Sequence, residues 1–475
     1  MKKMKIIISI IVLGLFTIVS CDKNFEEINT NPNDAITVPS GLLTADIVRL
    51  AMNINYSTFV GGDMGSCWAQ HWAKVNYEEE ERYKVRMSVI ETTIWKGVYE
   101  DVISDAYSME QLAIDEGNDA SRAVGIILQS YGYLLLTDMF GDIPFSEAMS
   151  SADGILAPKY DAQADVYAGV FAMLDEANAL LSTGIGTISA DGDLVYGGDA
   201  TGWQKFANSL KFRALMRASG QLDVAADLAE LTGRAMFTSN SDEAKLIYLD
   251  ADPNANPIYE SLVFGSRFEY KVNSVMVDRM ASLSDPRLAV YAAPNSDGEY
   301  RGKPSGIDAV PNDDYNYDNV SPVGDFYVNP NLPGFFMSYS ELQFLMAEAA
   351  LNGWISGSAE TYYYNGLKAS LEFNEVLGDF DAYITHPDVS YNGTLKQIAE
   401  QNWLGLYCQG VEAWTEWRRT GYPELQPAIE AVISEIPSRY FYPAIEQSVN
   451  GANNAAAVTA MGGDDALTTK VWWMK

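Results

Sequence analysis

Apolar residues recur at helical spacing through most of this 475-residue chain, and this pattern predicts a mainly α-helical fold. Ser338 and Glu341 form a capping-box pattern that predicts the start of one helix. A long helical segment is expected from Leu395 to about Arg419. The clearest apolar stripes are Trp95, Val98, Tyr99, Val102, Ala106, Met109 and Ala113; Val166, Val170, Met173, Leu174, Ala177 and Leu181; and Trp203, Phe206, Ala207, Leu210 and Ala214.

The predicted helices come in pairs, such as 84–117 followed by 121–137, whose length is typical of tetratricopeptide repeats. We therefore expect stacked helix hairpins, although the consensus residues of that repeat are not matched. Between about 241 and 333 the pattern changes to short runs among many Asn, Asp, Pro, Gly and Tyr residues. The chain thus predicts one large domain, 41–475, in which a loop-rich lobe interrupts a helical scaffold of about 84–240 and 335–420.

The first 20 residues have the pattern of a secretory signal peptide. Lys2, Lys3 and Lys5 precede an apolar run from Ile6 to Val19, which is shorter than the roughly 20 residues that a transmembrane helix needs. Cys21 follows directly, so we predict cleavage before Cys21 and lipidation of its thiol, with ordinary secretion as the alternative. Residues 21–40 are polar and are expected to form a lipid-anchored tether and docking segment.

The chain is strongly acidic, with 64 Asp and Glu against 31 Lys and Arg and a formal charge of −33. Such a charge repels nucleic acids and argues against binding an anionic membrane surface electrostatically. Membrane attachment is therefore expected through the N-terminal lipid. With 48% hydrophobic residues the chain can still bury a large core, so it is not expected to be disordered.

The sequence contains no motif that predicts catalysis or a cofactor. Asp138, Asp142 and Glu147 could pair as glycosidase carboxylates. In so acidic a chain such neighbours arise by chance, and a turn after a helix ending near Thr137 explains the segment better. His71 and His386 are too few for a typical zinc site. We expect a binding protein rather than an enzyme.

One segment has partial calcium-loop spacing. Its acidic and amide residues fall at positions 1, 3, 5 and 12, but Asn319 replaces the turn glycine. An Asx-rich turn is the favoured interpretation, and calcium is the weaker alternative. The four candidate ligands are Asp314, Asn316, Asp318 and Asp325.

A cluster of charged residues and tryptophans near the end of the chain has two interpretations. It can bind a ligand, because Arg and Trp are frequent recognition residues, or it can form ion pairs and core packing inside a helical scaffold, which we favour. Trp472 and Trp473 are expected to attach the C-terminus to the body of the protein. The cluster comprises Glu412, Trp414, Glu416, Trp417, Arg418 and Arg419, and the acids of neighbouring helices are expected to pair with Lys211, Arg213 and Arg217.

Two stretches combine aromatic and polar residues outside the apolar stripes, as a ligand site requires. In the first, the tryptophans are four residues apart and can instead form one buried helical face. In the second, the tyrosines can instead cover their own loop. Cys67 and Cys408 can be paired or free. The candidate ligand-binding residues are Trp68, Gln70, Trp72, Asn76 and Tyr77 in the first stretch, and Tyr300, Arg301, Tyr315 and Tyr317 in the second.

Several segments together resemble the SusD/RagB family of outer-membrane nutrient-binding lipoproteins, most closely its SusD-like second subfamily. They follow the family's order along nearly the whole chain, although no single one is diagnostic. The segments are FEEINTNPNDA (25–35), YLLLTDMFGDIPFSEA (133–148), PKYDAQADVYAGVFAMLDEA (158–177), WQKFANSLKFRALMRAS (203–219), ELQFLMAEAA (341–350), QNWLGLYCQGVEAWTEWRRTGYP (401–423), IPSRYFYPAIEQSVN (436–450) and TTKVWW (468–473).

The resemblance implies an α-rich domain with four tetratricopeptide-like helix pairs, held at the cell surface of the outer membrane by Cys21. Asp22, Glu26 and Glu27 resemble the family's surface-export signal. The implied partner is a SusC-type TonB-dependent transporter, on which the protein acts as a lid and to which it delivers oligosaccharides. Peptides are an alternative ligand. A surface glycoside hydrolase and a purely structural lid are further alternatives.

Overall fold

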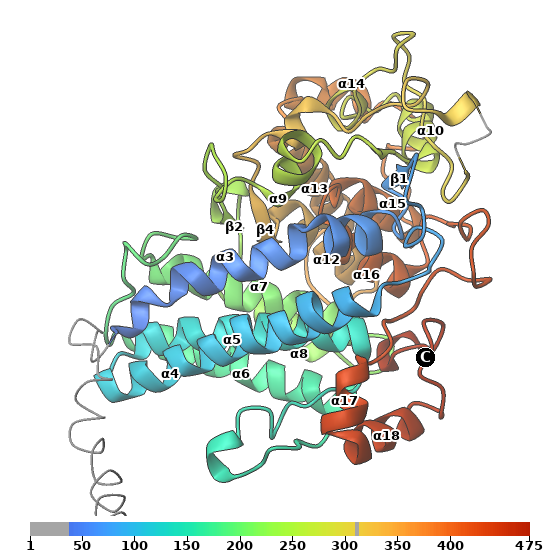
Figure 1. Ribbon diagram of the computed structural model, residues 1–475. Coiled ribbons are helices and arrows are strands. Elements are labelled where there is room, and N and C mark those ends of the chain that lie inside the picture. The colour runs from blue at the N-terminus through green and yellow to red at the C-terminus, as the bar shows by residue number, and fades with distance from the viewer. Residues whose placement is uncertain (1–37, 309–312) are drawn as a thin grey trace, which may run out of the picture. The chain divides into compact units, whose positions relative to one another are not determined.

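The computed structural model describes residues 38–308 and 313–475. The predicted signal peptide, Cys21 and nearly all of the predicted tether lie outside the described residues. From Ser40 to Lys475 the chain packs as one unit in which helices dominate and sheet is scarce (Figure 1). The predicted fold class, a single mainly helical domain, is confirmed.

The scaffold consists of helices that pack in consecutive pairs. In the first pair a continuous helical stretch, η3 and α4, packs on α5; α7 follows α6, α13 follows α12, and α16 follows α15. Helix α3 packs on η3. The bounds are α3 Thr44–Tyr56, η3 Val89–Ser104, α4 Asp105–Glu116, α5 Asp119–Phe140, α6 Gln163–Thr183, α7 Ala200–Ala218, α8 Ala225–Leu231, α12 Tyr339–Leu351, α13 Ala359–Phe373, α15 Leu395–Gly405 and α16 Gly410–Thr420.

The apolar stripes face the core of the domain. In α6, for example, Val166, Val170, Leu174 and Ala177 are all buried. The predicted cap of α12 is present, because the Ser338 hydroxyl accepts the Glu341 backbone N–H at 3.2 Å. Stripe spacing and capping residues therefore account for both the position and the buried face of these helices.

Helix α5 is long and apolar enough to cross a membrane, and it is the one such helix among the described residues. Its side chains are nevertheless almost all buried against α4, α6 and η3. It ends at Gly141, whose φ of +86° suits glycine. This is the turn that the sequence predicted, three residues later than expected, and α5 is the central helix of the core.

The predicted continuous helix from Leu395 to Arg419 is wrong, because α15 and α16 are separated by a break. Cys408 in this break has a φ of +63°. Gly410 then lies so close to the neighbouring η2 helix (Thr58–Ser66) that a methyl group on it would be 2.0 Å from the Gly61 carbonyl oxygen. The start of α16 thus packs directly on the backbone of η2. Cys67 and Cys408 are both buried and free.

The predicted loop-rich lobe consists of short elements around two small antiparallel sheets. One sheet joins β2 to β4, and the other joins β3 to β1, a strand that comes from well outside the lobe in sequence. The bounds are β1 Trp72–Lys74, β2 Ala244–Leu246, α9 Pro257–Tyr259, η6 Glu260–Phe264, β3 Tyr270–Val272, α10 Ser274–Ser282, α11 Leu288–Tyr291, η7 Asp313–Tyr315, η8 Asp325–Val328 and β4 Gly334–Met337. A further short helix, α14 (Phe380–Tyr383), lies outside the lobe in sequence and follows α13.

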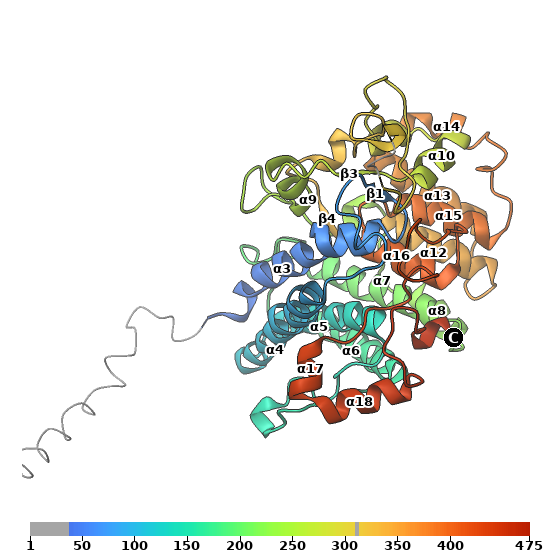
Figure 2. The same ribbon diagram turned by 45° about the vertical axis from the view of Figure 1, so that its right-hand side comes forward.

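Two C-terminal helices, α17 (Ala444–Val449) and α18 (Gly451–Ala460), were not predicted. They lie at the end of the domain opposite to β1, α10 and α14 in both views (Figures 1 and 2). Tyr160 donates a hydrogen bond to Glu446 at 2.8 Å and thereby attaches α17 to the segment before α6.

Candidate binding site

Pairing of β1 with β3 brings together the two stretches that were predicted to bind a ligand. Trp72 pairs with Val272, and Ala73 pairs with Lys271. Asn76 and Tyr77 follow β1 directly, while the Lys271 ammonium donates to the Tyr317 carbonyl at 2.8 Å. Residues about 240 positions apart thus share one surface.

Two neighbouring grooves open on this surface. The first, here called the Arg86 groove, has a volume of about 660 Å³ and is lined by Phe59, Tyr77, Glu79, Lys84, Arg86 and Arg267 among others. The second, here called the Lys271 groove, has a volume of about 500 Å³ and is lined by Arg267, Phe268, Lys271, Tyr317, Asp318 and Asp325 among others. Arg267 lines both grooves.

The grooves expose three aromatic rings. The exposed fractions are 58% for Tyr77, 62% for Phe268 and 44% for Tyr317. Asn76 is exposed beside them, and its side-chain oxygen accepts the Tyr77 backbone N–H at 2.9 Å. Flat rings edged by amide, hydroxyl and guanidinium groups can stack on the C–H faces of a sugar and hydrogen bond to its hydroxyls.

A buried ion pair supports the floor of the Arg86 groove. Asp63 and Lys74 are fully buried with 3.0 Å between Oδ1 and Nζ, and the Tyr270 hydroxyl donates to the same carboxylate oxygen at 2.7 Å. Arg86 reaches the other Asp63 oxygen at 3.5 Å and also pairs with Glu80. Burial raises the pKa of Asp63 to about 6, although Lys74 opposes the shift.

The first predicted stretch is divided between the core and the surface. Trp68 and Trp72 are each 1% exposed. The Trp68 indole donates to the Glu80 carbonyl at 2.9 Å and the Trp72 indole to the Tyr407 hydroxyl at 3.1 Å, while Gln70 is buried and donates to the Gln426 carbonyl. These three side chains offer no face to solvent, and they support the surface that bears Asn76 and Tyr77.

In the second predicted stretch only Tyr317 lines a groove. The Arg301 guanidinium lies over the Tyr315 ring, 5.1 Å from its centroid, and Tyr315 packs on a small cluster of Val75 and Val320. Tyr300 is 39% exposed and lines neither groove. Tyr315 thus covers its own loop, as in the alternative interpretation.

The segment with partial calcium-loop spacing contains an Asx turn. The Asn316 side-chain oxygen accepts the backbone N–H groups of Asp318 and Asn319 at 3.0 and 3.1 Å. Asp325 begins η8. No group of three or more His, Cys, Asp or Glu side chains suited to a metal ion occurs within 38–308 and 313–475.

Most residues of the grooves were not predicted from the sequence, among them Phe59, Lys84, Arg86, Arg267, Phe268 and Lys271. The segment Arg267–Val272 alternates charged and apolar residues, which is a period-two signal for a short strand. That signal was available. The position of Phe59 and Arg86 beside it depends on tertiary contacts alone.

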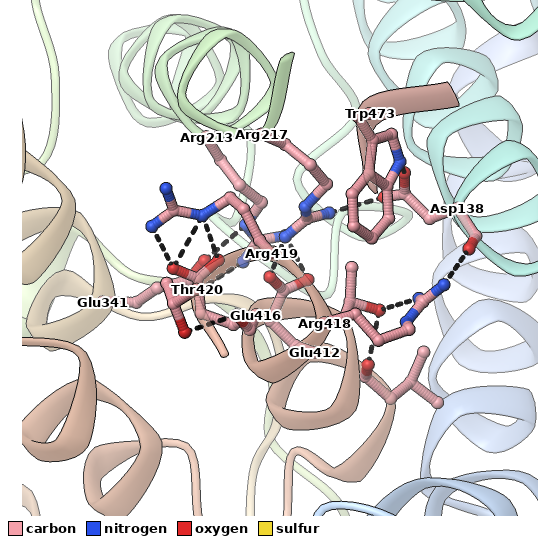
Figure 3. Close-up of polar contacts among 12 residues, drawn as sticks. Asp138, Arg213, Arg217, Glu341, Glu412, Glu416, Arg418, Arg419, Thr420 and Trp473 are labelled. Carbon is pink, nitrogen blue, oxygen red and sulfur yellow. Dashed lines mark hydrogen bonds and ion pairs between the residues drawn. The ribbon is translucent and has the colours of Figure 1, made fainter. Parts of the chain in front are cut away.

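The charged cluster of α16 forms the ion-pair network that the sequence favoured (Figure 3). Arg213 binds Glu341 through two nitrogens at 2.6 and 2.5 Å, and Arg217 binds Asp138 at 2.5 Å as well as Glu412.

The other members of this network are also paired. Arg419 binds Glu348 and Glu416, while Lys211 binds Asp175 of α6 at 2.6 Å. The Arg418 guanidinium is buried, lies 3.6 Å from the Trp414 ring centroid, and donates to the Asp138 and Ser438 carbonyls. Trp414 is fully buried and Trp417 donates its indole N–H to the Pro423 carbonyl at 3.1 Å. This cluster is structural.

The three acids near the end of α5 also have structural partners. Asp138 belongs to the network just described. Asp142 accepts the Gln163 backbone N–H at 2.8 Å, and Glu147 accepts that of Lys159 at 2.9 Å. Each carboxylate thus fixes a turn or a helix, which agrees with a structural role for the segment.

A family model described as starch-binding associating with outer membrane matches residues 31–443. The chain belongs to this SusD-like family. No curated protein sequence matches it significantly.

Solved structures of SusD-like proteins have the same fold. A chitin-binding protein is 27% identical, with a TM-score of 0.81 over 92% of this chain and 99% of its own. A SusD homologue from Bacteroides fragilis is 28% identical, with a TM-score of 0.77 over 92% and 100% of the two chains. A chitin-binding SusD homologue from Flavobacterium johnsoniae is 25% identical, with a TM-score of 0.77 over 92% and 97%.

Proposed function

We propose that this protein is a cell-surface lipoprotein of the outer membrane that captures oligosaccharides and delivers them to a SusC-type TonB-dependent transporter. The observation that carries the proposal is the pair of aromatic-lined grooves at the β1–β3 sheet. Membership of a family described as starch-binding, with two chitin-binding relatives, supports a carbohydrate ligand. A binding role rather than catalysis is part of the proposal.

The proposed contact residues are Tyr77, Phe268 and Tyr317, with Asn76 and Arg267 as hydrogen-bond donors. Stacking on an exposed ring contributes apolar burial, for which about 25 cal/mol per Å² is typical. The amide and guanidinium groups supply direction. Because Arg267 lines both grooves, a ligand of several sugar units can contact both.

Isothermal titration calorimetry of the full-length protein against starch, chitin and peptide ligands tests the binding role. We expect an oligosaccharide to bind saturably to the natural protein. Its affinity is expected to fall at least tenfold in Tyr77→Ala and in Tyr317→Ala. Tyr300→Ala is the matched control, because Tyr300 is exposed to a similar degree and lines neither groove. Binding of peptides but of no oligosaccharide would contradict a glycan ligand and support the peptide alternative. Release of a cleaved product from a glycan would contradict a purely binding role.

Delivery to a transporter requires a separate experiment. We expect affinity purification of the tagged protein from outer membranes to recover a TonB-dependent transporter, and cells without that transporter to bind the glycan but not take it up. Uptake that continues without the transporter would contradict delivery and leave glycan binding intact.

A further inference from the structure

The Arg86 groove differs in charge from the rest of this acidic protein. The whole chain carries 64 acidic and 31 basic residues. Three basic side chains that line this groove are exposed or partly exposed: Lys84, Arg86 and Arg267. Among the acids that line it in the described part of the chain, Glu79 is exposed and Glu80 is buried. Exposed positive charge therefore exceeds exposed negative charge here.

The acids that pair with Arg86 and Arg267 are buried, whereas the two arginines are partly exposed. Arg86 has a side-chain exposure of 47%, while its partners Glu80 and Asp63 are 6% and 0% exposed. Arg267 is 30% exposed and its partner Glu269 is 5% exposed. A guanidinium has five N–H donors, and these pairs use only part of each set. Both arginines line the groove and are partly exposed, so donors that the ion pairs do not use are available to a ligand.

The arginines are also held in place by an aromatic ring. Both guanidinium groups lie over Phe59, at 4.3 Å for Arg86 and 5.8 Å for Arg267 from the ring centroid. Such contacts restrict a long side chain, so less rotamer entropy is lost when a ligand binds. Lys84 is exposed and forms no ion pair with the described residues.

The neighbouring Lys271 groove has the opposite character. Asp318 and Asp325 are its exposed acids among the described residues, and the one partly exposed cation is Arg267, which it shares with the Arg86 groove. Lys271 is 4% exposed and donates to the Tyr317 carbonyl. A ligand with negative charge throughout its length would meet repulsion there. A ligand whose charge is confined to some units can place a charged unit in one groove and a neutral unit in the other.

We infer that the Arg86 groove binds the carboxylate of an acidic sugar unit, so that the ligand is an oligosaccharide containing uronic acid next to neutral units. A planar carboxylate suits bidentate hydrogen bonding by guanidinium groups. Tyr77 then stacks on the sugar ring, and Tyr317 and Phe268 contact the adjoining neutral unit. This inference rests on the proposed function and specifies its substrate class.

Calorimetry on the full-length protein tests the inference with matched ligands. Oligosaccharides of hyaluronan and of glucuronoxylan, in which uronic acid units adjoin neutral units, are each compared with the same compound after reduction of its carboxylates to hydroxymethyl groups. Oligosaccharides of polygalacturonate, which carry a charge on every unit, are expected to bind more weakly than these mixed ligands. Chitin and starch oligosaccharides are the neutral set. We expect one acidic ligand to bind at least tenfold more tightly than its reduced form, and its affinity to fall as NaCl rises from 0.05 to 0.5 M, because salt screens exposed charges.

Variants then locate the carboxylate. Lys84→Gln is expected to lower the affinity for the acidic ligand three- to tenfold and to leave the affinity for its reduced form unchanged. Because Lys84 is exposed and forms no ion pair within the described part of the chain, the variant is expected to keep its fold. Arg86→Gln is expected to lower the affinity for the acidic ligand more. Lys470→Gln is the control, since it removes the same charge from an exposed position outside the grooves.

The outcomes separate this inference from the proposed function. Binding of neutral oligosaccharides alone, or equal binding of an acidic ligand and its reduced form, overturns the inference and leaves glycan binding intact. Equal losses in Lys84→Gln and Lys470→Gln also overturn it. Failure to bind any oligosaccharide of either set overturns both.

Discussion

The Trp473 indole N–H donates to the Asp138 carboxylate at 2.9 Å and so joins the C-terminus to the central helix α5. The same carboxylate accepts an Arg217 N–H at 2.5 Å (Figure 3). It also accepts the Tyr167 hydroxyl at 2.5 Å. Asp138 is only 4% exposed. One buried carboxylate therefore connects α5, α6, α7 and the end of the chain.

We predict that Asp138→Asn destabilises the protein by about 3–5 kcal/mol, because removal of one partner leaves the buried Arg217 charge less compensated. Urea denaturation followed by circular dichroism measures the change. Asp153→Asn, at the exposed end of the short 3-10 helix η4 (Ser151–Asp153), is the control and is expected to change stability by less than about 0.5 kcal/mol. A similar small change in Asp138→Asn would contradict the structural role of this network.

His71 predicts a pH dependence of stability. It is fully buried between Trp403 and Tyr407, with ring centroids 4.8 and 5.7 Å away, and burial lowers its pKa to about 3. The unfolded chain then binds a proton near pH 6.5 that the folded protein does not bind. His71 therefore lowers the free energy of unfolding as pH falls from about 6.5 towards 3, by at most about 1.4 kcal/mol per pH unit.

Comparison with His71→Phe isolates this effect, since phenylalanine keeps an aromatic ring in the site and does not titrate. We expect the variant to gain stability relative to the natural protein as pH is lowered from 7 to 4. Asp63, whose pKa is raised to about 6, contributes with the opposite sign, but it is present in both proteins and cancels in the difference. If the free energy of unfolding depends on pH in the same way in both proteins from pH 7 to 4, the prediction is contradicted.

The sequence predicted the scaffold well because the relevant signals are local. The stripe of α6 and the Ser338 cap of α12 each depend on residues within one helix. The break before Gly410 was not predicted. Gly405 and Gly410 weaken a helix locally, but the close approach of Gly410 to η2, about 350 residues earlier, is a tertiary contact that apolar spacing does not show.

The candidate site was predicted in part for the same reason. Aromatic and polar composition marked Tyr77 and Tyr317, but nothing in either segment indicated that β1 pairs with β3 and brings them together. Trp68 and Trp72 lie in a stretch whose composition is typical of a binding site, but both side chains are buried in the core. Composition alone does not distinguish these two cases, since tryptophan is frequent in both.

The burial of Trp68 leads to a prediction that separates support from contact. Trp68→Phe removes the hydrogen bond to the Glu80 carbonyl, so we expect a loss of roughly 1–3 kcal/mol in the free energy of unfolding with little change in ligand affinity. Tyr77→Ala is expected to do the reverse, because the ring is exposed. Thermal denaturation and calorimetry on both variants measure this. A Trp68→Phe protein of natural stability that no longer binds would show that Trp68 contacts the ligand.

The predicted attachment through Cys21 lies outside the described residues and can be tested directly. The helical domain is strongly acidic, so electrostatic attraction cannot hold it on an anionic membrane, and stable anchoring by lipid requires more than one acyl chain. We expect mass spectrometry of protein expressed in a bacterium with an outer membrane to find Cys21 as the first residue, carrying a diacylglycerol and a third acyl chain. Cys21→Ser is expected to abolish this modification and remove the protein from the membrane fraction. An unmodified Cys21, or a Cys21→Ser protein that stays in that fraction after a high-salt wash, would mean that another segment attaches the domain.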